Sequence, residues 1–115
     1  MGAAFHYALQ GFVHTVKTQR SMKIHLVVAA VVLICGLAVH LERVEWAAVA
    51  ICVGLVLGSE LVNTALEALV DLASPEIHPK AKIAKDAAAA AVFVFAVTSV
   101  IVGFLVFASA LSRLL

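Results

Sequence analysis

Four polar side chains recur along one face of an otherwise apolar segment in the middle of the chain. They are, in order, Glu60, Asn63, Glu67 and Asp71. At about 100° per residue of an α-helix, these positions fall within about 80° of one another, so they form one polar stripe. A charged side chain in hydrocarbon costs at least about 2.5–3.5 kcal/mol. The polar stripe is therefore expected to line a polar site, to pair with basic side chains or to bind cations.

A short segment rich in ionisable groups follows the polar stripe at residues 74–86. It contains carboxylate, imidazole and amine side chains: Glu76, His78, Lys80, Lys82, Lys85 and Asp86. Magnesium prefers oxygen ligands, usually one or two carboxylates with phosphate oxygens, and lysines neutralise phosphate as point cations. The stripe and this segment together favour a site for a nucleotide and its Mg²⁺. The alternative is structural, with salt bridges from the stripe to Lys82 and Lys85.

The composition indicates that these groups lie in an integral membrane protein. Hydrophobic residues make up 64% of the 115 residues and charged residues 13%, against about 45–50% and about 25% in soluble domains. This excludes a disordered chain, a nucleic-acid module and an ordinary cytosolic domain. One domain is expected over 1–115. Neither a glycine-rich phosphate loop nor a protein-kinase motif is present, so phosphoryl chemistry requires another scaffold.

Three segments are long and apolar enough to cross a bilayer, whose core of about 30 Å needs about 20 helical residues. They are expected at about 24–42, 45–73 and 84–112. The middle one carries the polar stripe in its second half and ends before Pro75, because the residue before proline avoids the α-helical region. The fold class predicted is therefore an all-α membrane protein with three transmembrane helices.

Residues 3–21 are predicted to form an amphipathic helix on the membrane surface. Polar side chains gather on one side of it: His6, Gln10, His14, Lys17 and Ser21. A plain positioning anchor without chemistry is the alternative. His25, at the start of the first span, is interpreted as an interfacial residue without assigned chemistry.

The basic residues predict the orientation of the spans. Six of them lie before the first span or between the second and third: Lys17, Arg20, Lys23, Lys80, Lys82 and Lys85. Only Arg43 and Arg113 lie on the other side. The positive-inside rule then predicts a cytoplasmic N-terminus and second loop, with the C-terminus outside.

The polar stripe and the loop after it resemble the signature of the small prokaryotic diacylglycerol kinases. The matching blocks are Glu60–Asp71, Glu76-Ile77-His78 and Ala84-Lys85-Asp86, in matching order and spacing, and the resemblance covers nearly the whole chain. The loop Ser74–Pro79 is closer to the undecaprenol-kinase branch. The resemblance implies a homotrimeric lipid kinase of a prokaryotic cytoplasmic membrane, with the ATP site shared between subunits.

By matching positions, the resemblance implies that Glu60 is the general base and that Glu67 holds the Mg²⁺ that bridges the ATP phosphates. Asn63 and Asp71 would support this site. Nucleotide contacts are implied for Tyr7, Gln19, Glu67, Glu76, Ile77, His78, Lys85 and Asp86. Gln19 stands where the family commonly has a glutamate that supplies a second metal ligand, so here only a neutral carbonyl oxygen is offered.

The function predicted is transfer of the γ-phosphoryl group of MgATP to the hydroxyl of a membrane lipid alcohol, undecaprenol or diacylglycerol, with no nucleic-acid partner. Two other classes remain open at this point. A small proton- or cation-coupled transporter subunit would need its acids near the bilayer midplane. A non-catalytic assembly subunit would have its acids in salt bridges.

Overall fold

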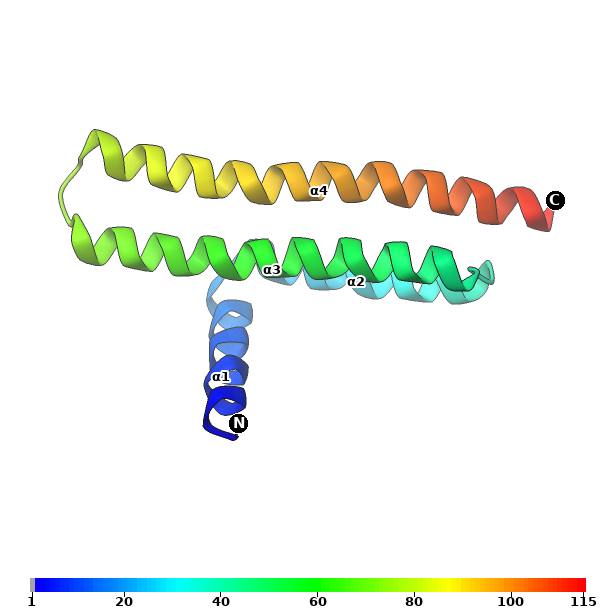
Figure 1. Cartoon of the computed structure of the whole chain (residues 1–115), viewed down its shortest axis with the longest axis horizontal. Coiled ribbons are helices and arrows are strands. Elements are labelled where there is room, and N and C mark those ends of the chain that lie inside the picture. The colour runs from blue at the N-terminus through cyan, green and yellow to red at the C-terminus, as the bar shows by residue number, and fades with distance from the viewer. Residues whose placement is uncertain (1) are drawn as a thin grey trace.

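The computed structural model describes residues 2–115, which form four α-helices and no strand. They are α1 (Gly2–Thr18), α2 (Arg20–Ala38), α3 (Arg43–Ala73) and α4 (Pro79–Leu114). The long helices α3 and α4 run antiparallel side by side, α2 packs along α3, and α1 points away from the other three (Figure 1). Helix α3 is therefore the element against which all the others are placed.

A single residue separates the first two helices. Gln19 has an extended backbone, with φ −107° and ψ 115°, and this changes the direction of the chain between α1 and α2. The helix expected over 3–21 accordingly ends at Thr18, and the first span begins at Arg20, where 24 was expected. The change of direction is what places the start of α2 beside α3 while α1 leaves the bundle.

The turn from α2 to α3 is short and capped at both ends. Leu41 N–H donates to Gly36 O at 3.1 Å, and His40 adopts a positive φ of 57°, the backbone arrangement of a Schellman helix end. The α3 helix then starts with a capping box in which Glu42 and Glu45 satisfy each other's backbone N–H groups. Consequently α2 ends at Ala38, where the sequence predicts a span reaching 42.

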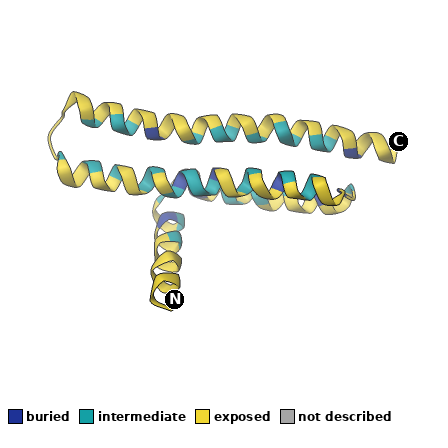
Figure 2. Cartoon of the chain, in the orientation of Figure 1, coloured by how far each residue is buried: buried dark blue, intermediate teal, exposed yellow. Residues whose placement is uncertain are grey.

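The small apolar core lies at this end of the molecule. Leu41, Val49 and Ala110 are buried there, with Trp46 and Phe107 packed against them. Most other apolar side chains face outward (Figure 2). Helices α2, α3 and α4 are each long and apolar enough to cross a membrane, so outward apolar side chains are expected to meet lipid.

The connection from α3 to α4 ends in a capped helix start. His78 Nδ1 accepts from Lys80 N–H at 3.1 Å, and Pro79 occupies the first helical position, where its missing N–H costs nothing. Helix α4 therefore begins at Pro79, five residues before the expected 84. Its first turns carry Lys82, Lys85 and Asp86 beside the end of α3.

Candidate functional site

The most buried carboxylate of the described residues lies in the middle of α3. Glu60 is 2% exposed and is held from α2. The Ser21 hydroxyl donates to Glu60 Oε1 at 2.7 Å, and His25 Nε2 lies 3.5 Å from Glu60 Oε2. Neither lysine nor arginine forms an ion pair with this carboxylate anywhere in residues 2–115. Its two oxygens therefore face a hydroxyl and an imidazole, which leaves the carboxylate able to accept a proton.

The next two members of the polar stripe form a pair along α3. Asn63 Nδ2 donates to Glu67 Oε1 at 3.3 Å. Asn63 Oδ1 is buried and has no hydrogen-bond partner among the described residues. A buried acceptor without a partner is costly in a folded chain, so this oxygen is available for a cation or a donor. With the Glu67 carboxylate it offers the oxygen donors that a divalent ion such as Mg²⁺ prefers.

The last member of the polar stripe is tied to α4. Lys85 Nζ donates to Asp71 Oδ1 at 2.5 Å, which joins the end of α3 to the start of α4. Lys82 pairs with Asp86 of its own helix at 2.6 Å. The structural alternative of salt bridges to the stripe thus holds for Lys85 and Asp71, and it does not hold for Lys82.

Other residues expected in the site lie apart from the polar stripe within one subunit. Glu76, Ile77 and His78 are exposed in the α3–α4 connection, and Tyr7 is exposed on α1. Gln19 lies at the break between α1 and α2. Across residues 2–115, side-chain hydrogen bonds or ion pairs do not join these five residues to the stripe. No group of three or more His, Cys, Asp or Glu side chains in the described chain could hold a metal by itself.

Two polar residues that contact Glu60 were not predicted to belong to the site. Ser21 was placed on the polar side of a surface helix, and His25 was treated as interfacial. Both lie on α2, four residues apart, so they share one helix face. That spacing, at the start of an otherwise apolar span, is the signal that could have identified them.

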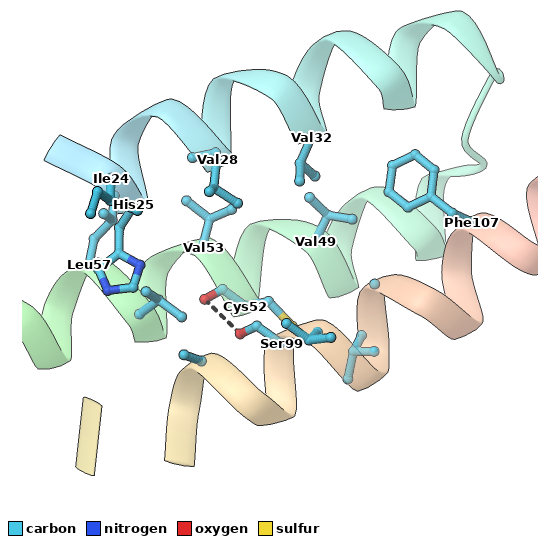
Figure 3. Close-up of a pocket in the computed structure, with 16 residues that line it drawn as sticks. Ile24, His25, Val28, Val32, Val49, Cys52, Val53, Leu57, Ser99 and Phe107 are labelled. Atoms are coloured by element: carbon cyan, nitrogen blue, oxygen red, sulfur yellow. Dashed lines mark hydrogen bonds between the residues drawn. The ribbon is translucent and has the colours of Figure 1, made fainter. Parts of the chain in front are cut away.

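An apolar groove of about 430 Å³ has among its lining residues His25, whose imidazole lies against Glu60. It is lined by α2, α3 and α4, with His25 and Leu57 at one end and Phe107 at the other (Figure 3). Its few polar groups include Ser99, whose hydroxyl donates to Cys52 O at 3.4 Å. The arrangement can accommodate a hydrocarbon chain whose polar end lies near Glu60.

Known proteins resemble this chain over most of its length. Residues 6–107 match the family described as prokaryotic diacylglycerol kinase. An undecaprenol kinase of Bacillus subtilis (strain 168) is 46% identical over 104 residues, which cover 90% of this chain and 85% of that protein. A diacylglycerol kinase of Synechocystis is 43% identical, covering 87% of this chain and 58% of its own length. A diacylglycerol kinase of Pseudomonas aeruginosa is 41% identical over 90 residues, which cover 76% of this chain and 72% of that protein.

Proposed function

We propose, for a chain that belongs to the prokaryotic diacylglycerol kinase family, that Glu60 is the general base at which a lipid hydroxyl attacks ATP. Membership of this family makes the protein a multi-pass membrane lipid kinase that uses ATP and a divalent metal. The transporter and assembly-subunit alternatives are therefore not favoured. What remains to be proposed is which residues act, which lipid is used and how the subunits assemble.

The observation that carries the role of Glu60 is its burial with no lysine or arginine paired to it among the described residues, against the imidazole of His25, which lines an apolar groove. In the proposed reaction, Glu60 takes the proton of the lipid hydroxyl while the alcohol oxygen bonds to the γ-phosphorus. The bond from that phosphorus to the β-phosphate oxygen breaks, and ADP leaves. A positioned general base is typically worth about 10²–10⁴-fold in rate.

Glu67 and Asn63 are the residues that would hold Mg²⁺, because their oxygens are the hard donors that this ion binds. The ion would neutralise charge on the phosphates of ATP. Gln19 would add a neutral carbonyl oxygen. Glu67 would hold its carboxylate toward the ion while Asn63 Nδ2 donates to its other oxygen, which fixes the orientation of the pair.

The nucleotide would lie against the start of α4 and the connection before it. Glu76, Ile77 and His78 are exposed there and free to meet a ligand. Lys85 would exchange its pairing with Asp71 for an ATP phosphate, beside Asp86. Tyr7 would reach the nucleotide from α1, whose polar and apolar sides suit a helix lying on the membrane surface.

A homotrimer with shared sites fits the incompleteness of one subunit. In the part of the chain that the structure describes, no side-chain hydrogen bond or ion pair joins Tyr7, Gln19 or residues 74–78 to the polar stripe of their own chain. The lining of a second groove between α3 and α4 includes the small residues Gly54, Gly58 and Ala91 beside larger apolar ones, and small residues allow close helix packing in membranes. The N-terminus and the α3–α4 connection would face the cytoplasm of a prokaryotic cell, where ATP is available.

Undecaprenol is proposed as the preferred lipid. The relative named undecaprenol kinase is the more similar of those compared, at 46% identity against 43% and 41% for two named diacylglycerol kinases. The loop Ser74–Pro79 also resembles the undecaprenol-kinase branch. Both lipids are apolar tails that end in one hydroxyl, so the groove beside Glu60 does not separate them.

The test is a phosphorylation assay in mixed micelles with radiolabelled ATP. Undecaprenol and diacylglycerol are each offered, with Mg²⁺ and with the metal chelated. We expect Mg²⁺-dependent labelling of lipid, faster with undecaprenol, and a loss of about 10²–10⁴-fold in kcat for Glu60→Gln. Faster labelling of diacylglycerol would reverse the lipid preference, and near-normal turnover of Glu60→Gln would remove the proposed base.

A further inference from the structure

A base that is as buried as Glu60 must lose the proton that it takes in each turnover. The Glu60 side chain is only 3% exposed, so it has little direct contact with water. The imidazole of His25, by contrast, is 21% exposed and lies against Glu60 Oε2. Ser21, the other neighbour of Glu60, is exposed as well, but a hydroxyl is too weak a base to take up a proton, so His25 is the neighbour that can accept a proton from Glu60 and pass it outward.

The two oxygens of Glu60 have different partners, which suggests different tasks. Oε1 accepts the hydrogen bond from the Ser21 hydroxyl at 2.7 Å, and this bond fixes the plane of the carboxylate. Oε2 faces the imidazole at 3.5 Å. The same imidazole lines the apolar groove, so His25 connects Oε2 with the groove.

We propose that Ser21 and His25 are positioning residues for Glu60, and that His25 accepts from Oε2 the proton which Glu60 took from the lipid hydroxyl. This rests on the proposed function of Glu60 as the base. The transfer breaks the Oε2–H bond and forms an Nε2–H bond when the other ring nitrogen carries the hydrogen of the neutral imidazole. Glu60 returns to a carboxylate, and the imidazolium loses its proton to water before the next turnover.

His25→Gln separates this relay from a structural role. A glutamine amide retains a hydrogen-bonding group near Glu60 and cannot accept a proton. The first turnover begins with an ionised Glu60 and does not need the relay, whereas every later turnover does. In rapid-quench experiments we therefore expect a burst of about one phosphorylated lipid per site at a near-normal rate, followed by steady-state turnover about tenfold or more below wild type.

Ser21→Ala and His25→Ala complete the set. Without the Ser21 hydroxyl the carboxylate is free to rotate, so the first turnover itself should slow, with KM for MgATP unchanged.

Added imidazole should restore steady-state turnover to His25→Ala and leave His25→Gln unchanged, because only the alanine variant leaves space for it. His40→Asn, at the opposite end of α2 in the exposed turn, is the matched control and should behave as wild type.

The outcomes distinguish the relay from the function on which it rests. Normal steady-state turnover of His25→Gln, beside an inactive Glu60→Gln, would overturn the relay and retain the base. A His25→Gln variant that is helical by circular dichroism but slowed equally in the first and later turnovers would also overturn it. Near-normal turnover of Glu60→Gln would instead remove the base itself.

Discussion

The two ends of the α3–α4 pair are built differently. At the end near the α2–α3 turn, polar groups are paired: Arg113 contacts Glu45 through Nη1 and Nη2 and Glu42 through Nε, beside the apolar core. At the other end, Lys85 and Asp71 join the two helices, but Asn63 Oδ1 is buried without a partner among the described residues, and the hydrogen bond to Glu67 comes from Asn63 of its own helix. One end consolidates the fold, and the other retains unused hydrogen-bonding capacity for ligands. Substitutions near the α2–α3 turn should therefore change the unfolding temperature, and those near the α3–α4 connection should change the dependence of activity on Mg²⁺.

The largest effect expected is at the ligand end. Glu67→Gln removes a charged oxygen from the proposed Mg²⁺ site and retains the size of the side chain. The Mg²⁺ concentration for half-maximal activity should rise by at least about tenfold, since losing groups that merely support metal ligands already costs about 10–100-fold in affinity. Thermal unfolding in detergent, followed by circular dichroism, should be unchanged.

The matched carboxylate at the other end is Glu45. Glu45→Gln weakens the contact to Arg113 and should lower the unfolding temperature without altering the Mg²⁺ titration. If Glu67→Gln lowered the unfolding temperature and left the Mg²⁺ titration unchanged, the division between the two ends would be wrong.

A smaller effect on stability is expected at Gly36. A Cβ there would lie 2.7 Å from Trp46 Cη2 and 2.9 Å from Leu41 Cδ1. Overpacking typically costs about 1–3 kcal/mol, while alanine in a helix gains about 0.8–1.0 kcal/mol over glycine, so Gly36→Ala should destabilise by roughly 1 kcal/mol. Denaturant titration measures this change, and the KM for MgATP should be unaltered. Gly11→Ala is the control, because nothing lies within 4 Å of a Cβ at that position, and it should be neutral or stabilising.

The smallest effect is expected for Arg113→Gln. Its ion pairs lie at the surface, where such pairs contribute little and are screened by salt. We expect a fall in unfolding temperature at low salt that is smaller than that of Gly36→Ala. The difference from wild type should vanish at high salt, which a pair of melting curves would show. A large fall that persists in salt would mean that the guanidinium acts through packing and not through charge.

Much of the architecture could be predicted because hydrocarbon restricts sequences strongly. Apolar runs separated by polar turns indicate three long helices, and Glu60, Asn63, Glu67 and Asp71 share a helix face by spacing alone. The break at Gln19 could not be predicted in this way. Lys17 and Ser21 continue the polar side of the preceding segment, so periodicity favoured one uninterrupted helix where the structure has two.

The different partners of the acidic side chains in the polar stripe also depend on the tertiary structure. Spacing treats Glu60 and Asp71 alike, yet Glu60 is buried against α2 and Asp71 is paired with Lys85 across the α3–α4 connection. The positions at which the neighbouring helices begin decide which acid pairs with a lysine and which one faces a hydroxyl and an imidazole. The sequence reading assigned no chemistry to His25 and missed its contact with Glu60 for the same reason, because this partner is 35 residues away along the chain.

The lengths of α2 and α3 can be compared with the thickness of the hydrocarbon core of a bilayer. Helix α2 has 19 residues and α3 has 31, so at about 1.5 Å per residue they measure about 28 Å and about 46 Å. A hydrocarbon core of about 30 Å accommodates the first and not the second. Helix α3 therefore exceeds this thickness by about 16 Å and exceeds α2 by about 18 Å. Because α2 packs along α3 and contacts Glu60 through Ser21 and His25, the excess length lies toward the α3–α4 connection. It carries Glu67 and Asp71, with the Lys85 of α4 that pairs with Asp71, beyond the reach of α2, and Glu60 lies at its base.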